Sequence, residues 1–442
     1  MISERAIDLE HGVIDNVVFS DEDIYRLELE RVFGRCWLFV AHDSMLPNDG
    51  AYVSNFMGED SVIVWRGKGG KIRVFLNKCL HRGNKVCLFD RGQSHTLTCT
   101  FHGWTYNSHG ELSGVPFLQE AYGGELDREA KGLVEARVGV YGGLIFACWD
   151  SAAPSLDEYL GELRWYIDHL VAMTATGGLE VIPGKQKYLM PSNWKLLSEN
   201  FGSDEYHVPV THASFFRVLR EFGAVRGGPG GGREVSIGYP SGVPHALGLL
   251  KTGEGAEDLY RVHLEHAGQL GADAVEWVTE RWARMQESQR DVANHPYQFV
   301  NGNIFPNFST ITIAPAFEAR SFILWHPRGP LSTEVWQWCA VERDAPRSIK
   351  EAAVRNMMQT QAAAGLIAPD DYENFERTRD NTSTRVARQV PFDYSMSLGK
   401  ETSYVGHDDP HMAGLPGLIG PEISEVNQRQ FYRYWSHLMF SD

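Results

Sequence analysis

The sequence has no long hydrophobic run, few cysteines and fewer basic than acidic residues. Its longest apolar stretch, GGLIFACW at 142–149, is far too short to span a bilayer. The first residues, MISERAIDLEHG, lack a basic segment followed by an apolar one, so no secretory leader is predicted. No Walker or dinucleotide-binding glycine motif occurs, and we therefore expect NADH to be handled by another protein.

The charge balance excludes several classes of partner. There are 41 Lys and Arg against 57 Asp and Glu, which gives a formal net charge of −16 at pH 7. Binding to nucleic acid or to an anionic membrane is therefore not expected. Six cysteines in 442 residues are too few for a disulfide scaffold. We expect a cytoplasmic protein with reduced cysteines and, from its length, two domains.

Half of the cysteines lie in one segment, together with histidines. CLHRGNKVCLFDRGQSHTLTCTFHGWTY, residues 79–106, contains the pairs Cys79/His81 and Cys99/His102. Three interpretations are open: four unrelated core residues, a zinc site, or a Rieske [2Fe–2S] cluster. Zinc sites usually group cysteine with cysteine and histidine with histidine. Here each loop offers one of each, as a Rieske cluster requires.

The residues around these loops favour the Rieske interpretation. Residues 61–65 and 71–77 alternate around a Gly-Lys-Gly-Gly turn, which predicts a β-hairpin leading into the first loop. Gly83 and Gly103 follow the histidines, and glycine allows a tight loop whose N–H groups face the cluster sulfurs. The aromatic side chains that close the segment, Trp104 and Tyr106, are expected to shield the cluster from water.

A second motif follows the first by about a hundred residues. NWKLLSENFGSDEYHVPVTH, residues 193–212, brings His207 and His212 together with a nearby carboxylate. Imidazole and carboxylate ligands suit non-haem Fe(II), whose 2-His-1-carboxylate set leaves positions open for O₂ and substrate. On one straight helix the two histidines would lie roughly 140° apart. Pro209 is expected to interrupt the helix, so that His207 ends one turn and His212 follows the break.

Residue chemistry alone leaves the third ligand ambiguous. Asp204 lies three residues before His207, as on one face of a helix. Farther along the chain, the segment 365–378 contains further candidates in Asp370, Asp371 and Glu373.

Together, the two motifs resemble the large (α) subunit of Rieske non-haem iron aromatic-ring-hydroxylating dioxygenases of the naphthalene and biphenyl dioxygenase type. The resemblance covers nearly the whole chain and includes four further stretches: IFPN (304–307), LWHPRGP (324–330), DDYEN (370–374) and NQRQFYRYWSHLM (427–439). It implies an α+β protein with an all-β Rieske [2Fe–2S] domain at 36–156. This domain is inserted near the N-terminus of a helix-grip (START/Bet v1-like) catalytic domain with an antiparallel sheet, formed by residues 1–35 and 157–442.

The resemblance also implies a role for each candidate residue. The cluster is held by Cys79, His81, Cys99 and His102, and mononuclear iron by His207, His212 and Asp371. Asp204 bridges an iron-ligand histidine and a Rieske histidine of a neighbouring subunit, with His102 as the expected partner. Asn200, which joins Asp204 among the catalytic residues, lines the substrate pocket with Phe201 and Glu205. An apolar or small residue is expected where Glu205 stands, so this glutamate either joins a polar network or contacts a polar group on the substrate.

The implied activity is that of a terminal oxygenase. Electrons from NADH arrive through a separate reductase, often with a ferredoxin, and O₂ converts an aromatic ring to a cis-dihydrodiol in aromatic catabolism. The substrate is a mono- or polycyclic aromatic compound. Because Glu205 could contact a polar group, the substrate could also carry polar substituents. A Rieske monooxygenase that hydroxylates or dealkylates an aromatic substrate is the alternative, and a non-catalytic electron carrier is the third hypothesis. The expected assembly is α₃β₃ with a small β subunit, or α₃.

Overall fold

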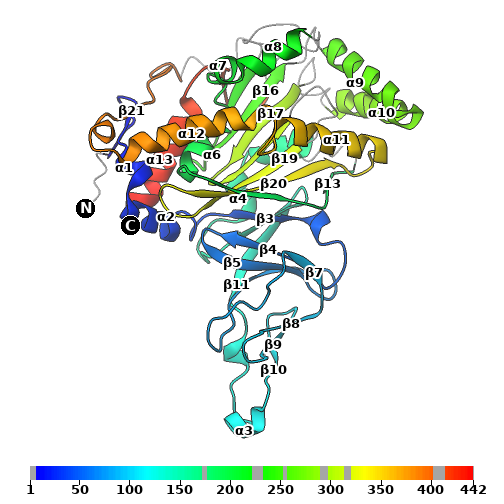
Figure 1. Cartoon of the computed structure of the whole chain (residues 1–442), viewed down its shortest axis with the longest axis vertical. Helices are drawn as coiled ribbons and strands as arrows, with labels where there is room; N and C mark the ends of the chain where they lie inside the picture. Colours follow the sequence, from blue (N-terminus) through cyan, green and yellow to red (C-terminus); the bar gives the residue numbers. More distant parts are fainter. Residues whose placement is uncertain are drawn as a thin grey trace. The chain divides into compact units, whose positions relative to one another are not determined.

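The computed structural model of the chain describes residues 6–171, 177–221, 232–251, 256–288, 297–312, 320–401 and 414–441. They form two compact units (Figure 1), one of residues 29–156 and one of residues 1–28 with 157–442. The inserted domain is predicted at 36–156, and residues 29–35 also group with the smaller unit. Among the residues that are described, no helix is long and apolar enough to cross a membrane.

The smaller unit is built from antiparallel strands. A seven-stranded sheet has the order β3-β12-β11-β6-β5-β4-β7, and a second sheet has the order β10-β9-β8. The strands are β3 (Leu38–His42), β4 (Ala51–Met57), β5 (Asp60–Arg66), β6 (Ile72–Leu76), β7 (Arg91–Gln93), β8 (Thr96–Thr98), β9 (Thr105–Asn107), β10 (Leu112–Gly114), β11 (Glu135–Tyr141) and β12 (Leu144–Cys148). The predicted hairpin is confirmed, because β5 pairs with β6 and places Trp65 opposite Arg73.

A nine-stranded antiparallel sheet forms the centre of the larger unit (Figure 1). Its order is β13-β20-β19-β18-β17-β16-β15-β22, and β14 also pairs with β20. The strands are β13 (Leu179–Val181), β14 (Gln186–Met190), β15 (Gly232–Ile237), β16 (His245–Lys251), β17 (Tyr297–Ile304), β18 (Phe308–Thr312), β19 (Arg320–Pro327), β20 (Thr333–Glu342) and β22 (Leu418–Pro421).

Helices pack against this sheet, with α6 on β19, α13 on β15 and on α6, and α11 on β20. The helices are α1 (Val17–Ser20), α2 (Glu22–Arg31), α4 (Leu156–Leu160), α5 (Leu163–Tyr166), α6 (Trp194–Asn200), α7 (Val208–Thr211), α8 (Ala213–Glu221), α9 (Ala256–Leu270), α10 (Ala272–Ser288), α11 (Arg347–Thr360), α12 (Ala368–Ser383) and α13 (Val426–Phe440). Helices held by one long antiparallel sheet are what a helix-grip domain requires, and the predicted α+β class is confirmed.

A buried charged cluster fastens the N-terminal segment to α6 and α13. Glu28 and Lys195 are both fully buried, and their charged groups lie 2.5 Å apart. The indole N–H groups of Trp194 and Trp435 each donate to Glu28 at 2.8 Å. A buried ion pair is tolerated only when its remaining hydrogen-bonding capacity is satisfied, and the two indoles do this for the glutamate.

The first turns of α13 are buried on all sides, polar residues included. The Asn427 side-chain amide donates to the carbonyl of Gly202 at 3.0 Å, and that of Gln428 to the carbonyl of Glu199 at 3.4 Å. Carbonyl groups at a helix C-terminus have no partner within the helix. The Glu199 carbonyl also accepts from the Gly202 N–H at 2.8 Å. The amides of α13 therefore add to the hydrogen bonds that hold the end of α6 and the loop after it.

Loss of one member of the buried pair should destabilise the larger unit. Glu28→Ala leaves the Lys195 ammonium group in the core without its counter-charge, and we expect the unfolding free energy to fall by about 3–5 kcal/mol. Denaturant unfolding followed by tryptophan fluorescence measures the change. Glu22→Ala removes only an exposed pair with Arg26 and should cost under about 1 kcal/mol. Equal losses in the two variants would contradict this account of the core.

Candidate metal sites

Two loops of the smaller unit share one backbone design. In each, a glycine N–H donates to the carbonyl of the cysteine four residues earlier, Gly83 to Cys79 at 2.9 Å and Gly103 to Cys99 at 3.0 Å. Each cysteine N–H donates to the carbonyl five residues later at 2.8 Å. The glycines have φ of 77° and 76°, which residues with a Cβ rarely adopt. The glycine N–H groups therefore close the loops. Other backbone N–H groups of the loops donate to sulfur, as predicted: that of His81 to Cys79, and those of Phe101 and His102 to Cys99.

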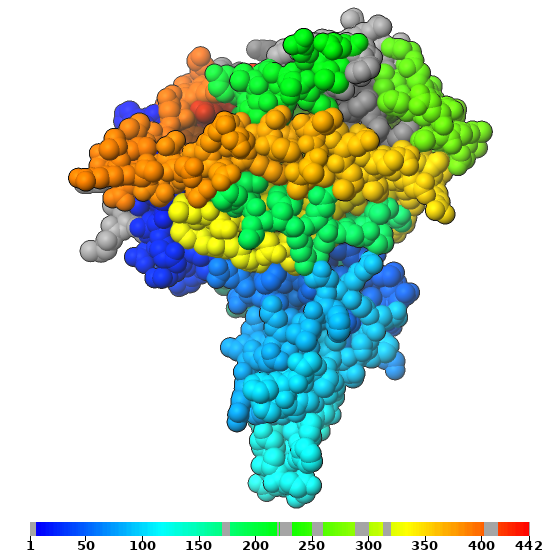
Figure 2. Space-filling view, viewed as in Figure 1, coloured from blue at the N-terminus to red at the C-terminus, as the bar shows by residue number. Residues whose placement is uncertain are grey.

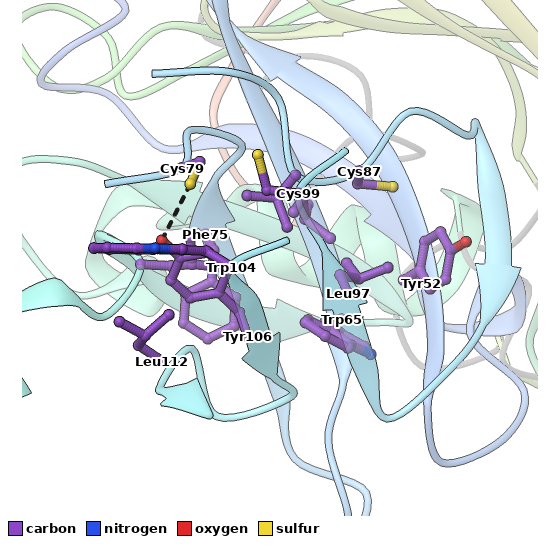
Figure 3. Close-up of a cluster of buried hydrophobic side chains, with 13 residues drawn as sticks. Tyr52, Trp65, Phe75, Cys79, Cys87, Leu97, Cys99, Trp104, Tyr106 and Leu112 are labelled. Atoms are coloured by element: carbon purple, nitrogen blue, oxygen red, sulfur yellow. Dashed lines mark hydrogen bonds between the residues drawn. The ribbon is translucent and has the colours of Figure 1, made fainter. Parts of the chain in front are cut away.

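The two thiols lie in one buried core (Figure 3). Cys79 and Cys99 are each 2% exposed. The Tyr106 hydroxyl lies 3.5 Å from Cys79 Sγ and accepts a hydrogen bond from the Leu80 N–H at 3.0 Å. The side-chain amide of Asn84 donates to Cys99 Sγ at 3.7 Å. Tyr106 therefore does more than the predicted shielding, because it contacts one of the sulfurs directly.

Burial and hydrogen bonds have opposite effects on the thiol pKa, and their balance differs between the two cysteines. Burial raises the pKa of the Cys79 thiol, and its hydrogen bonds reverse this only in part. Burial also opposes ionisation of Cys99, but donation from the Phe101 N–H and the Asn84 amide outweighs it and lowers the Cys99 pKa. The loops thus offer donors to thiolates, which is the form of cysteine that binds metal.

The two imidazoles of these loops face each other. The ring centroids of His81 and His102 are 4.4 Å apart, and Trp104 stacks on His81 at 4.9 Å. Within the described part of the chain, the buried Nδ1 atom of His81 has no hydrogen-bond partner. Partial burial, together with positive charge on His102 and Arg82, lowers the pKa of His81 and favours the neutral ring that metal binding needs. These residues fit a Rieske cluster.

The larger unit brings the two downstream histidines and one carboxylate together. The Nε2 atoms of His207 and His212 lie 3.4 and 3.2 Å from the same Asp371 Oδ1 atom. One ligand atom from each of the three residues lies within 4.8 Å of the others. Of the other late carboxylates, Glu373 pairs with Arg377 at 2.7 Å and is directed elsewhere.

Both histidines flank a single short helix. His207 is the N-cap and His212 the C-cap of α7. The prediction that Pro209 interrupts a helix between them is wrong. Pro209 lies in the first turn of α7, where its missing N–H would have had no partner in the helix, so it helps to begin the helix. Because both histidines lie at helix ends, the angular separation expected on a straight helix does not apply.

Each imidazole has a second carboxylate at its other ring nitrogen. Asp204 Oδ2 lies 3.6 Å from His207 Nδ1, and Asp370 Oδ2 lies 3.5 Å from His212 Nδ1. A carboxylate in this position fixes the ring orientation and makes the opposite nitrogen a stronger metal ligand. Residue chemistry gave Asp370 only as a candidate ligand. Its place directly before Asp371 is the signal for this second role, which the sequence analysis missed.

The electrostatics of the triad favour a bound cation. Burial alone would lower the pKa of His207, but Asp204 and Asp371 raise it to about 10. Burial would raise the pKa of Asp371, yet the two histidines lower it. The carboxylates therefore favour positive charge at this position, which a divalent metal ion would supply. The donor set fits mononuclear iron.

A tight turn joins α6 to the first histidine. The helix ends at the half-buried Asn200, and Ser203 has a φ of 71°. Asp204 therefore reaches His207 from a turn, and the prediction that the two share a helical face is wrong. The ring of Phe201 packs on β19. The pocket-lining roles of Asn200 and Phe201 remain predictions.

Glu205 belongs to a polar network. The Asn301 side-chain amide on β17 donates to Glu205 Oε1 at 2.7 Å. Burial raises the pKa of Glu205, and this hydrogen bond opposes the shift only in part. Of the two alternatives for this position, the structure contains the polar network. The pairing also avoids a buried carboxyl group without a partner, which would be costly.

Contacts of α12 hold the shared carboxylate in place. The hydroxyl of Tyr372, next to Asp371, hydrogen-bonds that of Tyr188 on β14. The Asn374 amide donates to Thr211 Oγ1 of α7 at 3.3 Å. Figure 2 shows α11 and α12 running along the visible face of the larger unit, with α8 beside α12. The site is thus assembled from two helices that are tied directly to each other.

Comparisons with known proteins cover the whole chain. Residues 36–131 match the family described as Rieske [2Fe–2S] domain, and residues 156–440 match the family described as ring hydroxylating alpha subunit (catalytic domain).

Individual relatives extend the match. Biphenyl 2,3-dioxygenase subunit alpha of Rhodococcus jostii (strain RHA1) is 37% identical over 98% of this chain and 90% of its own. Benzene 1,2-dioxygenase subunit alpha of Pseudomonas putida is 35% identical over 99% of this chain and 93% of its own. The structure of naphthalene 1,2-dioxygenase with indole bound in the active site has a TM-score of 0.82 at 31% identity, covering 99% and 94% of the two chains.

The contact between Tyr106 and Cys79 should set part of the reduction potential of a cluster held by these loops. Tyr106→Phe removes a hydrogen bond that stabilises the charge added on reduction, worth about 1 kcal/mol. We therefore expect the midpoint potential to fall by roughly 40 mV, as follows for a one-electron couple. Redox titration of the visible absorbance measures it. Tyr122→Phe alters a tyrosine that packs near Trp104 and should leave the potential unchanged. An equal shift in both variants would count against the contact.

Proposed function

Because the chain belongs to the family of ring-hydroxylating dioxygenase α subunits, which carry a Rieske [2Fe–2S] cluster and mononuclear iron, we propose that it is the terminal oxygenase that converts an aromatic ring to a cis-dihydrodiol. The observation that carries the proposal is the meeting of His207, His212 and Asp371 around one point. The reaction consumes O₂ with two electrons, supplied from NADH by a separate reductase, and two protons. Both oxygen atoms enter the product.

The substrate that we propose is a mono- or polycyclic arene. Its relatives are biphenyl, benzene and naphthalene dioxygenases, which supports this substrate class. The iron held by His207, His212 and Asp371 would supply the activation of O₂. The residues of the chain do the rest of the work. Asp204 and Asp370 orient the two imidazoles, and the half-buried Asn200 and Phe201 position the ring beside them.

We propose that Asp204 is a positioning residue that links His207 to His102 of a neighbouring copy of the chain. Its carboxylate is partly exposed, and Oδ2 lies 3.6 Å from His207 Nδ1. The other oxygen can therefore accept a hydrogen bond from a neighbouring copy of the chain. Large apolar side chains are exposed beside both metal sites, namely Phe101 next to His102, and Tyr206 and Val210 around His207. Such exposed groups support a partner surface. An α₃β₃ or α₃ assembly, a ferredoxin and a cytoplasmic location are proposed with it.

Isotopically labelled O₂ tests the proposed reaction. The protein, a matched reductase and a panel of one-, two- and three-ring arenes are incubated together, and the products are analysed by mass spectrometry. A cis-diol with two labelled oxygens is the expected product. A product with one labelled oxygen would establish the alternative, a Rieske monooxygenase. No oxidation of any arene, with the cluster reduced and iron present, would refute both.

Loss of one triad imidazole should affect the mononuclear iron site and leave the cluster intact. We expect His207→Ala to lose the mononuclear iron and turnover, because two ligands hold the ion too weakly, while the visible absorbance of the cluster remains. Cys79→Ser is the reciprocal variant and should lose that absorbance. Metal analysis and visible spectroscopy measure both. Full iron content in His207→Ala would contradict the ligand assignment.

Neutralising Asp204 should impair turnover without removing either metal. Asp204→Asn keeps the shape of the side chain but removes the charge beside His207, and outer-sphere changes of this kind cost about 10–100-fold in activity. Single-turnover oxidation of the reduced protein measures the effect. Glu373→Gln is the control, because Glu373 pairs at the surface with Arg377. Unimpaired oxidation in Asp204→Asn would exclude the linking role.

A further inference from the structure

Two buried polar atoms beside the triad lack partners. Ser203 is fully buried and Asn301 is 7% exposed. Among the residues described, Ser203 Oγ and Asn301 Oδ1 have no hydrogen-bond partner. Buried polar atoms in proteins are almost always hydrogen-bonded, so an unpartnered pair calls for a group that the chain itself does not supply.

Glu205 fixes which way the Asn301 amide faces. The Asn301 Nδ2 atom donates to Glu205 Oε1 at 2.7 Å. A carboxylate only accepts hydrogen bonds, so the NH₂ end of the amide faces it and the carbonyl end faces away. Reversing the amide would place two acceptor oxygens against each other. Asn301 Oδ1 is therefore held as an acceptor that faces away from Glu205.

Gly248 accommodates the Asn301 side chain. It lies opposite Asn301 in the pairing of β16 with β17, at a β-bulge. A Cβ on Gly248 would lie 2.4 Å from Asn301 Oδ1 and 3.1 Å from Ser203 Oγ. The two unpartnered oxygens thus both lie against Gly248, and a side chain at this position would displace Asn301. Bulges often occur next to active sites, where they redirect a side chain.

Asn301 lies on the face of the sheet that α6 covers. Alternate residues of a strand share a face, so Asn301 lies on the same side as Asn303. Ser198 of α6 donates to Asn303 Oδ1 at 3.0 Å. Glu205 comes two residues before His207, and the two side chains interact electrostatically. The polar groups and the triad therefore belong to one part of the interior.

We propose that Asn301 Oδ1 and Ser203 Oγ form an acceptor subsite for an N–H or O–H group on the aromatic substrate, with Glu205 as the positioning residue that holds the amide. The inference rests on the proposed function and narrows its substrate class to arenes that carry a hydrogen-bond donor. In a site of this kind, an analogue without the donor leaves the buried acceptors unpaired and binds more weakly.

Indole and indene test the subsite. They match in size, but indole carries an N–H donor where indene has a CH₂ group. Dissociation constants are measured by calorimetry on the iron-loaded holoenzyme without O₂ or reductase. The wild type should bind indole about tenfold more tightly than indene. Asn301→Ala and Glu205→Ala should bring the ratio to within about twofold, since each removes or releases the acceptor. Glu205→Gln retains an oxygen for Asn301 Nδ2 and should keep most of the preference.

The ratio of the two dissociation constants separates a loss of N–H recognition from a general packing defect. A packing defect weakens both ligands alike, and Glu265→Ala, an exposed site on α9, should leave the ratio unchanged. If only water meets the two oxygens, the wild type should bind indole and indene equally, and this result would overturn the proposal. A preference for indole that survives Asn301→Ala would overturn it too. Turnover with labelled O₂ is assayed separately. Preferential binding without oxidation would refute the proposed function and leave the subsite standing.

Discussion

The contact of two imidazoles with one carboxylate oxygen is the constraint that the structure of the larger unit has to satisfy. His207 and His212 come from the two ends of α7, and Asp371 comes from α12, far along the chain. The two imidazole rings are in edge contact, with centroids 5.3 Å apart, but this contact does not place the carboxylate. The positions of the three side chains must be imposed by the surrounding structure, and a hydrogen bond between Asn374 and Thr211 ties the two helices directly.

Support for this contact extends through the core. Amides of α13 donate to carbonyl groups at the end of α6 and in the loop after it, and α6 and α13 are joined by indole hydrogen bonds to the buried Glu28. Outer carboxylates at both Nδ1 atoms orient the imidazoles. The same principle governs the smaller unit, where two glycine-closed loops present one thiol and one imidazole each. Supporting hydrogen bonds and ion pairs therefore hold the candidate ligands of both sites in position.

Much of this could be predicted from sequence because the residues that bind metals are few and their spacing is distinctive. The pairs Cys79/His81 and Cys99/His102, and the hairpin leading to them, are local features. The choice of carboxylate was not local, since residue chemistry could not rank Asp371 above Asp204 or Asp370. Resemblance to a family made that choice, and the geometry places Asp371 between the imidazoles. The effect of Pro209 was misjudged because a proline that breaks a helix and one that begins it look alike in sequence. The buried polar face of α13 and the Glu205–Asn301 pair depend on tertiary packing, which periodicity does not report.

An anomalous difference map at the iron absorption edge, from crystals of freshly iron-loaded protein, tests the central claim most directly. The account predicts a single peak enclosed by His207, His212 and Asp371, and a separate binuclear peak between the Cys79 and Cys99 loops. Iron density at the loops with none among the two imidazoles and Asp371 would contradict it.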